Sequence, residues 1–311
     1  MTVAARRAGP PRRGGAMTVA GASRPRLYLK LGRVSNLPTV WTNVAAGIAL
    51  GGGSFERGAP LRLGVALSLF YVGGMFLNDA FDRAIDARER PERPIPSGQI
   101  AAKEVFVVGF GLLATGLIGV MTTAASLGAS AIQAGLPGAV LAGLVLLYDA
   151  WHKKNPFSPV VMGLCRSGVY VTAGLAAGGV PSHGLVTGAL AGGAYVVGLT
   201  FVARQENRKS FRAGATLALL ASPALLAVAH PTRGVVVWVA LALAVLWAAA
   251  AVAPLFRSGP VDVPRSVVRL IAGISLVDGL LLAMAGEPAL ALAGIIGLVA
   301  TLALQRWVRG T

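Results

Sequence analysis

The stretch 78–86 has the sequence Asn-Asp-Ala-Phe-Asp-Arg-Ala-Ile-Asp, in a chain of 311 residues with only 12 Asp and Glu. Asn78, Asp82 and Asp86 are spaced four residues apart, and Asp79 lies three residues before Asp82. On a helix this spacing puts the side chains on or beside one face, about one turn apart. Carboxylates placed in this way repel each other, and oxygen ligands suit Mg2+. The stretch therefore predicts a divalent cation site.

The composition of the chain is that of a membrane protein. Hydrophobic residues make up 55% of it and charged residues only 13%, whereas soluble domains average about 25% charged residues. Apolar stretches long enough to cross a bilayer of about 30 Å recur along the chain. We therefore expect an all-α, polytopic transmembrane helical bundle.

Ten apolar segments are predicted. The first is short, so nine to ten transmembrane helices are expected. They cover residues 38–53, 59–80, 103–125, 132–149, 158–178, 185–204, 213–229, 235–255, 265–285 and 288–307. The basic residues of the connections alternate between the two sides, as the positive-inside rule requires. This pattern predicts a multi-pass protein of the plasma membrane with a cytoplasmic N-terminus. It also explains the net charge of +16 without a nucleic-acid partner.

The N-terminal residues differ in composition from the rest of the chain. Residues 1–33 contain eight Arg or Lys and no acid, so we expect a basic, disordered cytoplasmic tail. Residues 34–311 are expected to form a single transmembrane domain. Cys165 is the only cysteine, which excludes an intramolecular disulfide.

Three connections on the predicted cytoplasmic side contain unusual polar residues, at 78–98, 148–156 and 203–212. Polar groups at the ends of three helices on one face can converge on a single cavity. In the first of them, the prolines of 90–98 exclude a helix. A stiff loop there would hold Arg93 over the acids, where its guanidinium can bind phosphate oxygens bidentately.

These residues resemble a known family. Asn-Asp-x-x-Asp-x-x-x-Asp followed by Arg-Pro-x-Pro-Ser-Gly, within 78–98, is similar to the first signature of the UbiA superfamily of membrane prenyltransferases. Arg33-x-x-Asn36 adds to the resemblance. The resemblance implies a UbiA-like bundle that holds a prenyl diphosphate through Mg2+ and transfers the prenyl group to an acceptor, often an aromatic ring or quinone precursor. It implies a metal and diphosphate motif made of Asn78, Asp79, Asp82 and Asp86, with Asp79 and Asp82 catalytic.

The end of the fourth segment resembles a second motif of that family. Tyr148 is followed by His152 at the fourth position and by Lys153 at the fifth, which is similar to a variant of the family's Tyr-x-x-x-Lys motif. The resemblance implies that Lys153 contacts the diphosphate and that Tyr148 orients it or the acceptor. The alternative is an aromatic and lysine anchor at the membrane interface.

The stretch 201–208 departs from the family pattern. The second acidic motif, Asp-x-x-x-Asp, belongs there, but this chain has no paired aspartates at that place. Glu206 is then the expected metal ligand, and Arg204 or Arg208 would replace a missing cation. Loss or alteration of catalysis is the other interpretation.

Two further polar residues are expected to bind substrate. Arg166 lies inside the fifth segment, where a charge is costly against lipid and should face a cavity. It either binds an anionic group of the acceptor or pairs with Asp278 of the ninth segment. Asn36 either lines the pocket or bonds between helices.

The sequence thus favours Mg2+-dependent prenyl transfer from a prenyl diphosphate to a small acceptor, with the lipid bilayer as its surroundings. The acceptor is expected to be aromatic or a quinone precursor. The alternative is a catalytically altered family member that binds or transports a lipid or pigment precursor without prenyl transfer.

Overall fold

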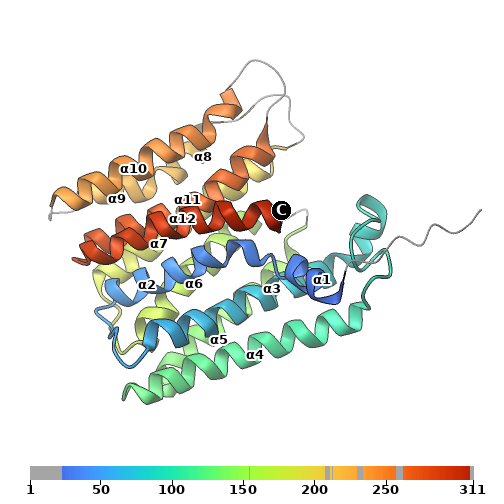
Figure 1. The fold of residues 1–311 in the computed structure, drawn as a ribbon, viewed down its shortest axis with the longest axis horizontal. Helices are drawn as coiled ribbons and strands as arrows, with labels where there is room; N and C mark the ends of the chain where they lie inside the picture. The colour runs from blue at the N-terminus through green and yellow to red at the C-terminus, as the bar shows by residue number, and fades with distance from the viewer. Residues whose placement is uncertain are drawn as a thin grey trace, which may run out of the picture.

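The computed structural model describes residues 23–153, 155–206, 211, 213–229, 234–256 and 262–308, and every regular element within these ranges is helical (Figure 1). The elements are α1 (Arg24–Leu31), η1 (Val34–Asn36), α2 (Leu37–Leu50), α3 (Ala59–Glu89), α4 (Ala102–Ser126), α5 (Ala131–Trp151), α6 (Ser158–Ala176), α7 (His183–Ala203), α8 (Gly214–Leu220), α9 (Ser222–Ala229), α10 (Val235–Val252), η2 (Ala253–Phe256), α11 (Val263–Met284) and α12 (Pro288–Trp307). The predicted all-α bundle is confirmed.

Eight of the described helices are long and apolar enough to cross a membrane, whereas ten segments were expected. The first difference is α2, whose 14 residues span only about 21 Å at 1.5 Å per residue. The second is 213–229, which is divided at Ala221 into α8 and α9. Pro223 has no N–H to donate to the carbonyl of Leu219, and the Ser222 hydroxyl donates to that carbonyl instead, at 2.7 Å.

Small residues let several helices pack closely, as expected for helices in lipid. At the contact of α11 with α12, a Cβ atom added to Gly294 would lie 2.6 Å from the carbonyl oxygen of Ser275. A Cβ atom added to Gly163 of α6 would lie 2.7 Å from the carbonyl oxygen of Gly193 of α7. Larger side chains at these positions would force the helices apart.

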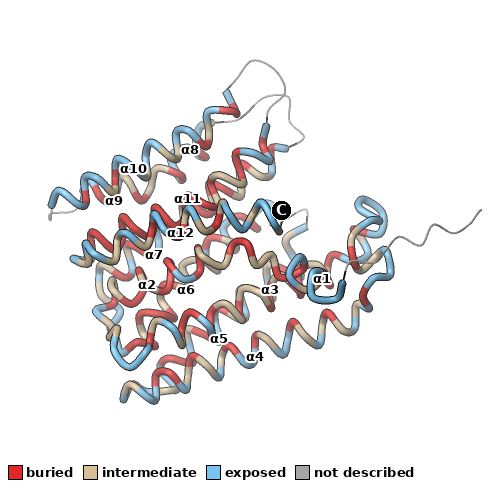
Figure 2. Tube along the Cα trace, viewed as in Figure 1, coloured by how far each residue is buried: buried red, intermediate tan, exposed pale blue. Residues whose placement is uncertain are grey.

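Burial divides the bundle into central and peripheral helices (Figure 2). α11 is buried along nearly its whole length, whereas α10 has only three buried residues, Val237, Leu241 and Ala251. The exposed side chains of α10 include Val235, Val239 and Leu246. An apolar exposed face fits contact with lipid rather than with water.

The expected N-terminal tail is partly wrong. Residues 1–22 lie outside the described residues, but 24–31 form α1, whose Leu27 and Leu31 are buried in a cluster with Phe76 of α3. The rings of Tyr28 and Phe76 lie 5.5 Å apart. The Tyr28 hydroxyl donates to Glu104 of α4 at 2.5 Å, and this carboxylate raises the pKa of the Tyr28 phenol. The many basic residues of 1–33 led to the prediction of disorder, although Leu27 and Leu31 pack against α3.

Candidate functional site

The acidic stretch lies on the last turns of α3, at the end of the bundle that also carries α1 (Figure 1). α3 has 31 residues and is about 46 Å long, so its end extends beyond a hydrocarbon core of about 30 Å. Asn78, Asp82 and Asp86 are buried, whereas the side chain of Asp79 is 13% exposed. The predicted common face of the helix is therefore turned into the protein.

The loop after α3 folds back over these acids. Arg93 Nη1 lies 2.7 Å from Asp86 Oδ2 and 3.5 Å from Asp79 Oδ1. The Ser97 hydroxyl donates to the carbonyl of Arg93 at 2.7 Å, which tightens the loop. The structure thus brings Arg93 to the acids, as expected from the prolines of this segment.

Arg33 is a site residue to which the sequence analysis assigned no role. Its Nη2 lies 3.4 Å from Asp79 Oδ1, and its Nη1 lies 3.4 Å from the sulfur of Met75. Its backbone has a φ of 44°, in the left-handed region, at the junction between α1 and η1. The Arg33-x-x-Asn36 pattern was the available signal, but it does not reveal that the guanidinium reaches an acid 46 residues away.

The connection from α5 to α6 brings two basic side chains to Asp82. Lys153 Nζ lies 3.2 Å and His152 Nε2 lies 3.4 Å from Asp82 Oδ2. The His152 ring stacks on Tyr148 with ring centroids 4.8 Å apart, and its Nδ1 lies 3.1 Å from the Tyr148 carbonyl oxygen. Lys153 and Tyr148 are thus placed beside the acids, although their expected roles in catalysis stay predictions.

Asp149 is a further acid of this region, next to Tyr148 in the sequence. It lies on the last turn of α5 and is 3% exposed. Its Oδ1 accepts a hydrogen bond of 3.2 Å from Asn78 Nδ2, whereas its Oδ2 is buried with no hydrogen-bond partner. The position of Asp149 beside Tyr148 is the signal in the sequence that it could supply a carboxylate to the same site.

At the end of α7, no hydrogen bond or ion pair among the described residues joins Arg204 or Glu206 to the acids of α3. Arg204 donates hydrogen bonds to the carbonyls of Asn155 and Pro156 and to the Ser158 hydroxyl, the last at 2.7 Å. Its guanidinium therefore fastens the end of α7 to the start of α6. Glu206 is exposed, and no described ion pair joins it to another residue. Arg208, also expected to bind substrate, lies outside the described residues.

A cavity of about 430 Å³ opens beside these groups and extends between the helices. Its polar lining residues at the site end are Arg33, Asn36, Arg90, Arg93, Tyr148 and Asp149. Its apolar lining comes from several helices and includes Leu67, Phe70, Leu141, Val169, Val196, Leu199 and Ile274. Such a cavity fits an amphiphile with an anionic head and an apolar tail.

Arg166 and Asn36 both line this cavity. Arg166 Nη2 donates to the Thr39 carbonyl at 3.0 Å, while its Nε is buried without a hydrogen-bond partner. No described ion pair joins Arg166 to Asp278, which accepts hydrogen bonds from Thr42, at 2.5 Å, and from Tyr170. Asp278 and Arg166 are still close enough to interact electrostatically, so the expected pairing of the two residues stays a prediction.

Asn36 is both a cavity residue and an interhelical hydrogen-bonding residue. Its Nδ2 donates to the Tyr71 hydroxyl and its Oδ1 accepts from Gln305 Nε2, both at 3.1 Å. Asn36 therefore both lines the cavity and forms hydrogen bonds between helices. Its amide is positioned by α3 and α12, and it lies at the cavity wall.

The site provides oxygen ligands of the kind that Mg2+ prefers. Among the described residues, no group of three or more His, Cys, Asp or Glu side chains is arranged to hold a metal ion. Mg2+ binds proteins through one or two carboxylates and completes its coordination with phosphate oxygens and water. The orphaned Oδ2 of Asp149 is a free ligand atom for such an ion. The basic side chains around the acids are suited to the phosphates themselves.

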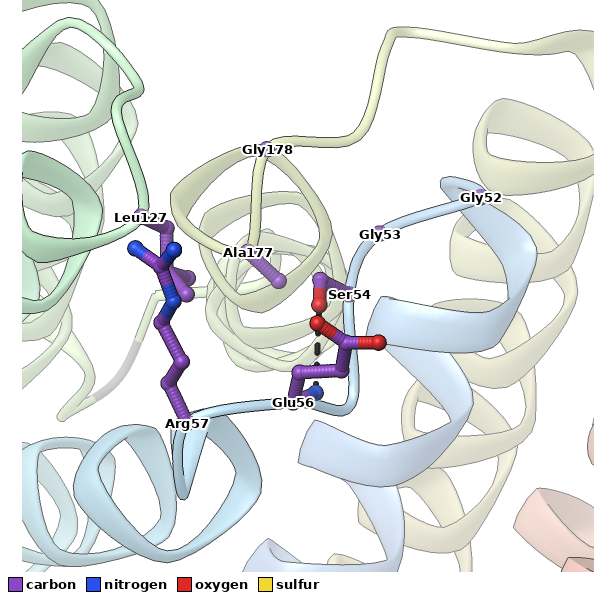
Figure 3. A pocket seen from close by; sticks show the side chains of 8 residues that line it. All are labelled: Gly52, Gly53, Ser54, Glu56, Arg57, Leu127, Ala177 and Gly178. Carbon is purple, nitrogen blue, oxygen red and sulfur yellow. Dashed lines mark hydrogen bonds between the residues drawn. The ribbon is translucent and has the colours of Figure 1, made fainter.

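A second cavity, at the connection between α2 and α3 (Figure 3), lies at the end of the bundle opposite α1 (Figure 1). It measures about 360 Å³ and is formed by the connection 52–57 together with Leu127, Ala177 and Gly178. Figure 3 shows Arg57 pointing toward Leu127, and its Nη1 donates to the Ser126 carbonyl at 3.1 Å. Its charged lining residues are Glu56 and Arg57, whereas the first cavity is lined by four arginines and Asp149.

The fold and the site together define a polytopic helical membrane protein with an acidic and basic cavity mouth at one end of the bundle. The model of the UbiA prenyltransferase family matches residues 39–270. The chain therefore belongs to the UbiA prenyltransferase family.

Curated relatives of this chain are named digeranylgeranylglyceryl phosphate synthases. The protein from Methanopyrus kandleri is 36% identical over 92 residues, which are 30% of this chain and 34% of the relative. The protein from Methanoregula boonei is 34% identical over 122 residues, 37% of this chain and 40% of the relative. The matched stretch thus spans well under half the length of these relatives.

Solved structures match the fold over most of the chain. A UbiA homologue from Aeropyrum pernix K1 has a TM-score of 0.56 and 19% identity, with 85% of this chain and 96% of that chain covered. A structure described as that of a digeranylgeranylglyceryl phosphate synthase in membranes has a TM-score of 0.54 and 21% identity, covering 88% of this chain and 98% of that one. At these identities the likeness supports the fold alone.

Proposed function

We propose that the protein transfers a prenyl group from a prenyl diphosphate to an acceptor held in the same cavity. The observation that carries the proposal is the cavity itself, which has arginines and Asp149 at one end and an apolar wall between the helices. One of these arginines, Arg93, also contacts Asp79 and Asp86 of α3. A prenyl diphosphate has the matching distribution of charge and apolar surface. Membership of the UbiA prenyltransferase family supports the proposal.

In this proposal the diphosphate binds at the mouth of the cavity, between α3 and the α5–α6 connection. Oxygens of Asn78, Asp79, Asp82 and Asp86 are the proposed ligands on α3, and one or two carboxylates among them would hold a Mg2+ ion. The bound ion would supply positive charge to neutralise the diphosphate. Lys153 and Arg93 would turn from the acids to the phosphate oxygens, because both already lie at this mouth. The bond between the prenyl C1 and the diphosphate oxygen breaks, and the diphosphate leaves with the electron pair.

The remaining allylic cation needs a dry site and a nearby acceptor. The apolar wall of the cavity excludes water, and Tyr148 presents an aromatic ring there, which can stabilise a cation. The acceptor forms the new bond to C1 and releases a proton. The roles of Tyr148 and of Asn36, at the same wall, are part of the proposal.

Arg166 indicates that the acceptor has an anionic group. Its buried Nε has no partner and the side chain lines the cavity, so an acceptor with a carboxylate or phosphate would satisfy it. An aromatic acid and a lipid phosphate both have such a group. The names of the relatives refer to a glyceryl phosphate, which makes a non-aromatic acceptor equally compatible with the site.

The protein would act in the plasma membrane, with its N-terminus and the mouth of the cavity on the cytoplasmic side. The eight candidate spans support a multi-pass protein. The basic connections 83–103 and 152–153 lie at the end of the bundle with the acids, which supports the orientation by the positive-inside rule.

One assay tests the proposed reaction. Purified protein in lipid nanodiscs is given radiolabelled geranyl, farnesyl or geranylgeranyl diphosphate, Mg2+ and a panel of aromatic acids and glyceryl phosphates. We expect a prenylated product whose rate falls by about 100-fold or more in Asp82→Asn, because stabilisation of leaving charge is lost. Glu89→Gln is the matched control, since Glu89 is an exposed acid on the same helix.

The alternative function is binding or transport of a lipid or pigment precursor without turnover. The exposed position of Glu206, where the family has a second acidic motif, is the observation that favours it. Mg2+-dependent binding of the diphosphate with no product from any acceptor would support this alternative. Absence of diphosphate binding would contradict both functions.

A further inference from the structure

Asp149 joins α5 to the acidic end of α3. Its Oδ1 accepts a hydrogen bond of 3.2 Å from Asn78 Nδ2, across 71 residues of sequence. Only 3% of its surface is exposed, and it lines the cavity. A carboxylate from a second helix thus touches the first residue of the acidic stretch.

The second oxygen of Asp149 lacks any partner. Asp79, Asp82 and Asp86 each have an Arg, His or Lys nitrogen within 3.5 Å. No ion pair among the described residues includes Asp149, and its Oδ2 is buried with no hydrogen-bond partner. A buried carboxylate oxygen without a partner is costly, and more so in a membrane protein. This oxygen is therefore available to a bound cation, which would offset the cost of its burial.

We infer that Asp149 is a direct ligand of the divalent cation, and that it supplies the second acidic side of the site from α5. The inference rests on the proposed function and deepens it. Asn78 gives its amide nitrogen to Asp149, which leaves the Asn78 carbonyl oxygen for the cation. Asp82 follows one helical turn later on the same face of α3. The cation then lies between α3 and α5, with phosphate oxygens completing its coordination.

The end of α7 is a poorer source of this carboxylate. Glu206 is exposed, and the neighbouring Arg204 is held by the α5–α6 connection and the start of α6. Asp149 is buried and bonded to Asn78, whereas Glu206 is exposed and forms no ion pair among the described residues. The two acids therefore form a matched pair for a test.

The first experiment measures metal affinity and not activity. Mn2+ is titrated into the full-length protein in nanodiscs with geranyl diphosphate and no acceptor, and free Mn2+ is followed by electron paramagnetic resonance against a protein-free blank. We expect Asp149→Asn to weaken Mn2+ binding by at least about tenfold, the lower end of the effect of disturbing even an outer-shell group. Glu206→Gln is expected to leave the affinity unchanged. Equal affinity of Asp149→Asn and the wild type would overturn the inference.

Asp149→Asn is chosen because an amide oxygen can still accept the hydrogen bond from Asn78. The thermal unfolding midpoint of each variant identifies any that have lost the fold. If the wild type itself binds no Mn2+, the proposed function fails together with the inference. If the wild type binds Mn2+ and Asp149→Asn binds it equally well, only the inference fails.

A second experiment separates a ligand from a residue that merely orients Asn78. Asp149→Cys and Glu206→Cys are each made in a Cys165→Ala background, so that the introduced thiol is the only one in the chain. Thiolates prefer soft metals such as Cd2+. A gain in Cd2+ over Mn2+ affinity in Asp149→Cys, absent from Glu206→Cys, is the expected result. Loss of Mn2+ affinity without a gain for Cd2+ would show that Asp149 only positions Asn78.

Discussion

Lys153 Nζ lies 3.2 Å from Asp82 Oδ2 and connects the turn after α5 to the acidic end of α3. The lysine side chain is 40% exposed, whereas that of Asp82 is 5% exposed. The contact thus joins a buried acid to a lysine that solvent can reach. A diphosphate entering there meets a lysine that is already placed and accessible.

The first prediction concerns this lysine. Lys153→Met should raise the dissociation constant of the prenyl diphosphate by about 10- to 100-fold, because a hydrogen bond to a charged group contributes about 1.5–3 kcal/mol. Equilibrium binding of a radiolabelled diphosphate measures the effect. Lys103→Met is the control, since Lys103 is an exposed lysine at the start of α4. A change of similar size in both variants would indicate a general effect of surface charge.

The second prediction separates the donor from the acceptor. Arg166→Gln should raise the KM for an anionic acceptor by about tenfold or more, since a charge-assisted hydrogen bond is lost. The dissociation constant of the prenyl diphosphate should not change, because Arg166 donates to the Thr39 carbonyl and makes no ion pair with the acids of α3. Steady-state kinetics with an anionic acceptor and its neutral ester provide the comparison. Equal losses with both acceptors would contradict a role in recognising the anion.

The third prediction concerns Arg204, which binds two carbonyls and the Ser158 hydroxyl. Arg204→Ala should lower the free energy of unfolding by about 1–3 kcal/mol, because buried acceptors lose their donor. Thermal or denaturant unfolding in detergent measures this loss. Arg265→Ala is the control, since Arg265 is exposed at the start of α11. Unchanged stability with a tenfold weaker affinity for diphosphate would instead support the predicted role in substrate binding.

The fourth prediction concerns the packing of α11 on α12. Gly294→Val should destabilise the protein by about 1–3 kcal/mol, the usual cost of overpacking, because a Cβ atom there would lie 2.6 Å from the Ser275 carbonyl oxygen. Gly143→Val is the matched control, since a Cβ atom at Gly143 meets no atom within 4 Å. Unfolding midpoints in the same detergent give the comparison. A similar loss in both variants would point to helix propensity instead of packing.

Much of the fold could be predicted because hydropathy is a local property. A run of about 20 apolar residues is sufficient to identify a membrane span, and eight of the ten predicted segments have that length in the structure. The two exceptions depend on details that hydropathy averages out. One is the short α2, and the other is the break before Pro223 that divides 213–229.

The sequence by itself determined which groups share a face of α3, because the spacing of Asn78, Asp82 and Asp86 matches the period of a helix. It did not determine which partners they meet. The contacts of Arg33 with Asp79 and of Asp149 with Asn78 join residues 46 and 71 positions apart. Helical periodicity extends only along one helix, whereas the packing of α1, α3 and α5 decides which side chains face each other. Only the tertiary structure therefore identifies Asp149 as the acid with an unpaired oxygen.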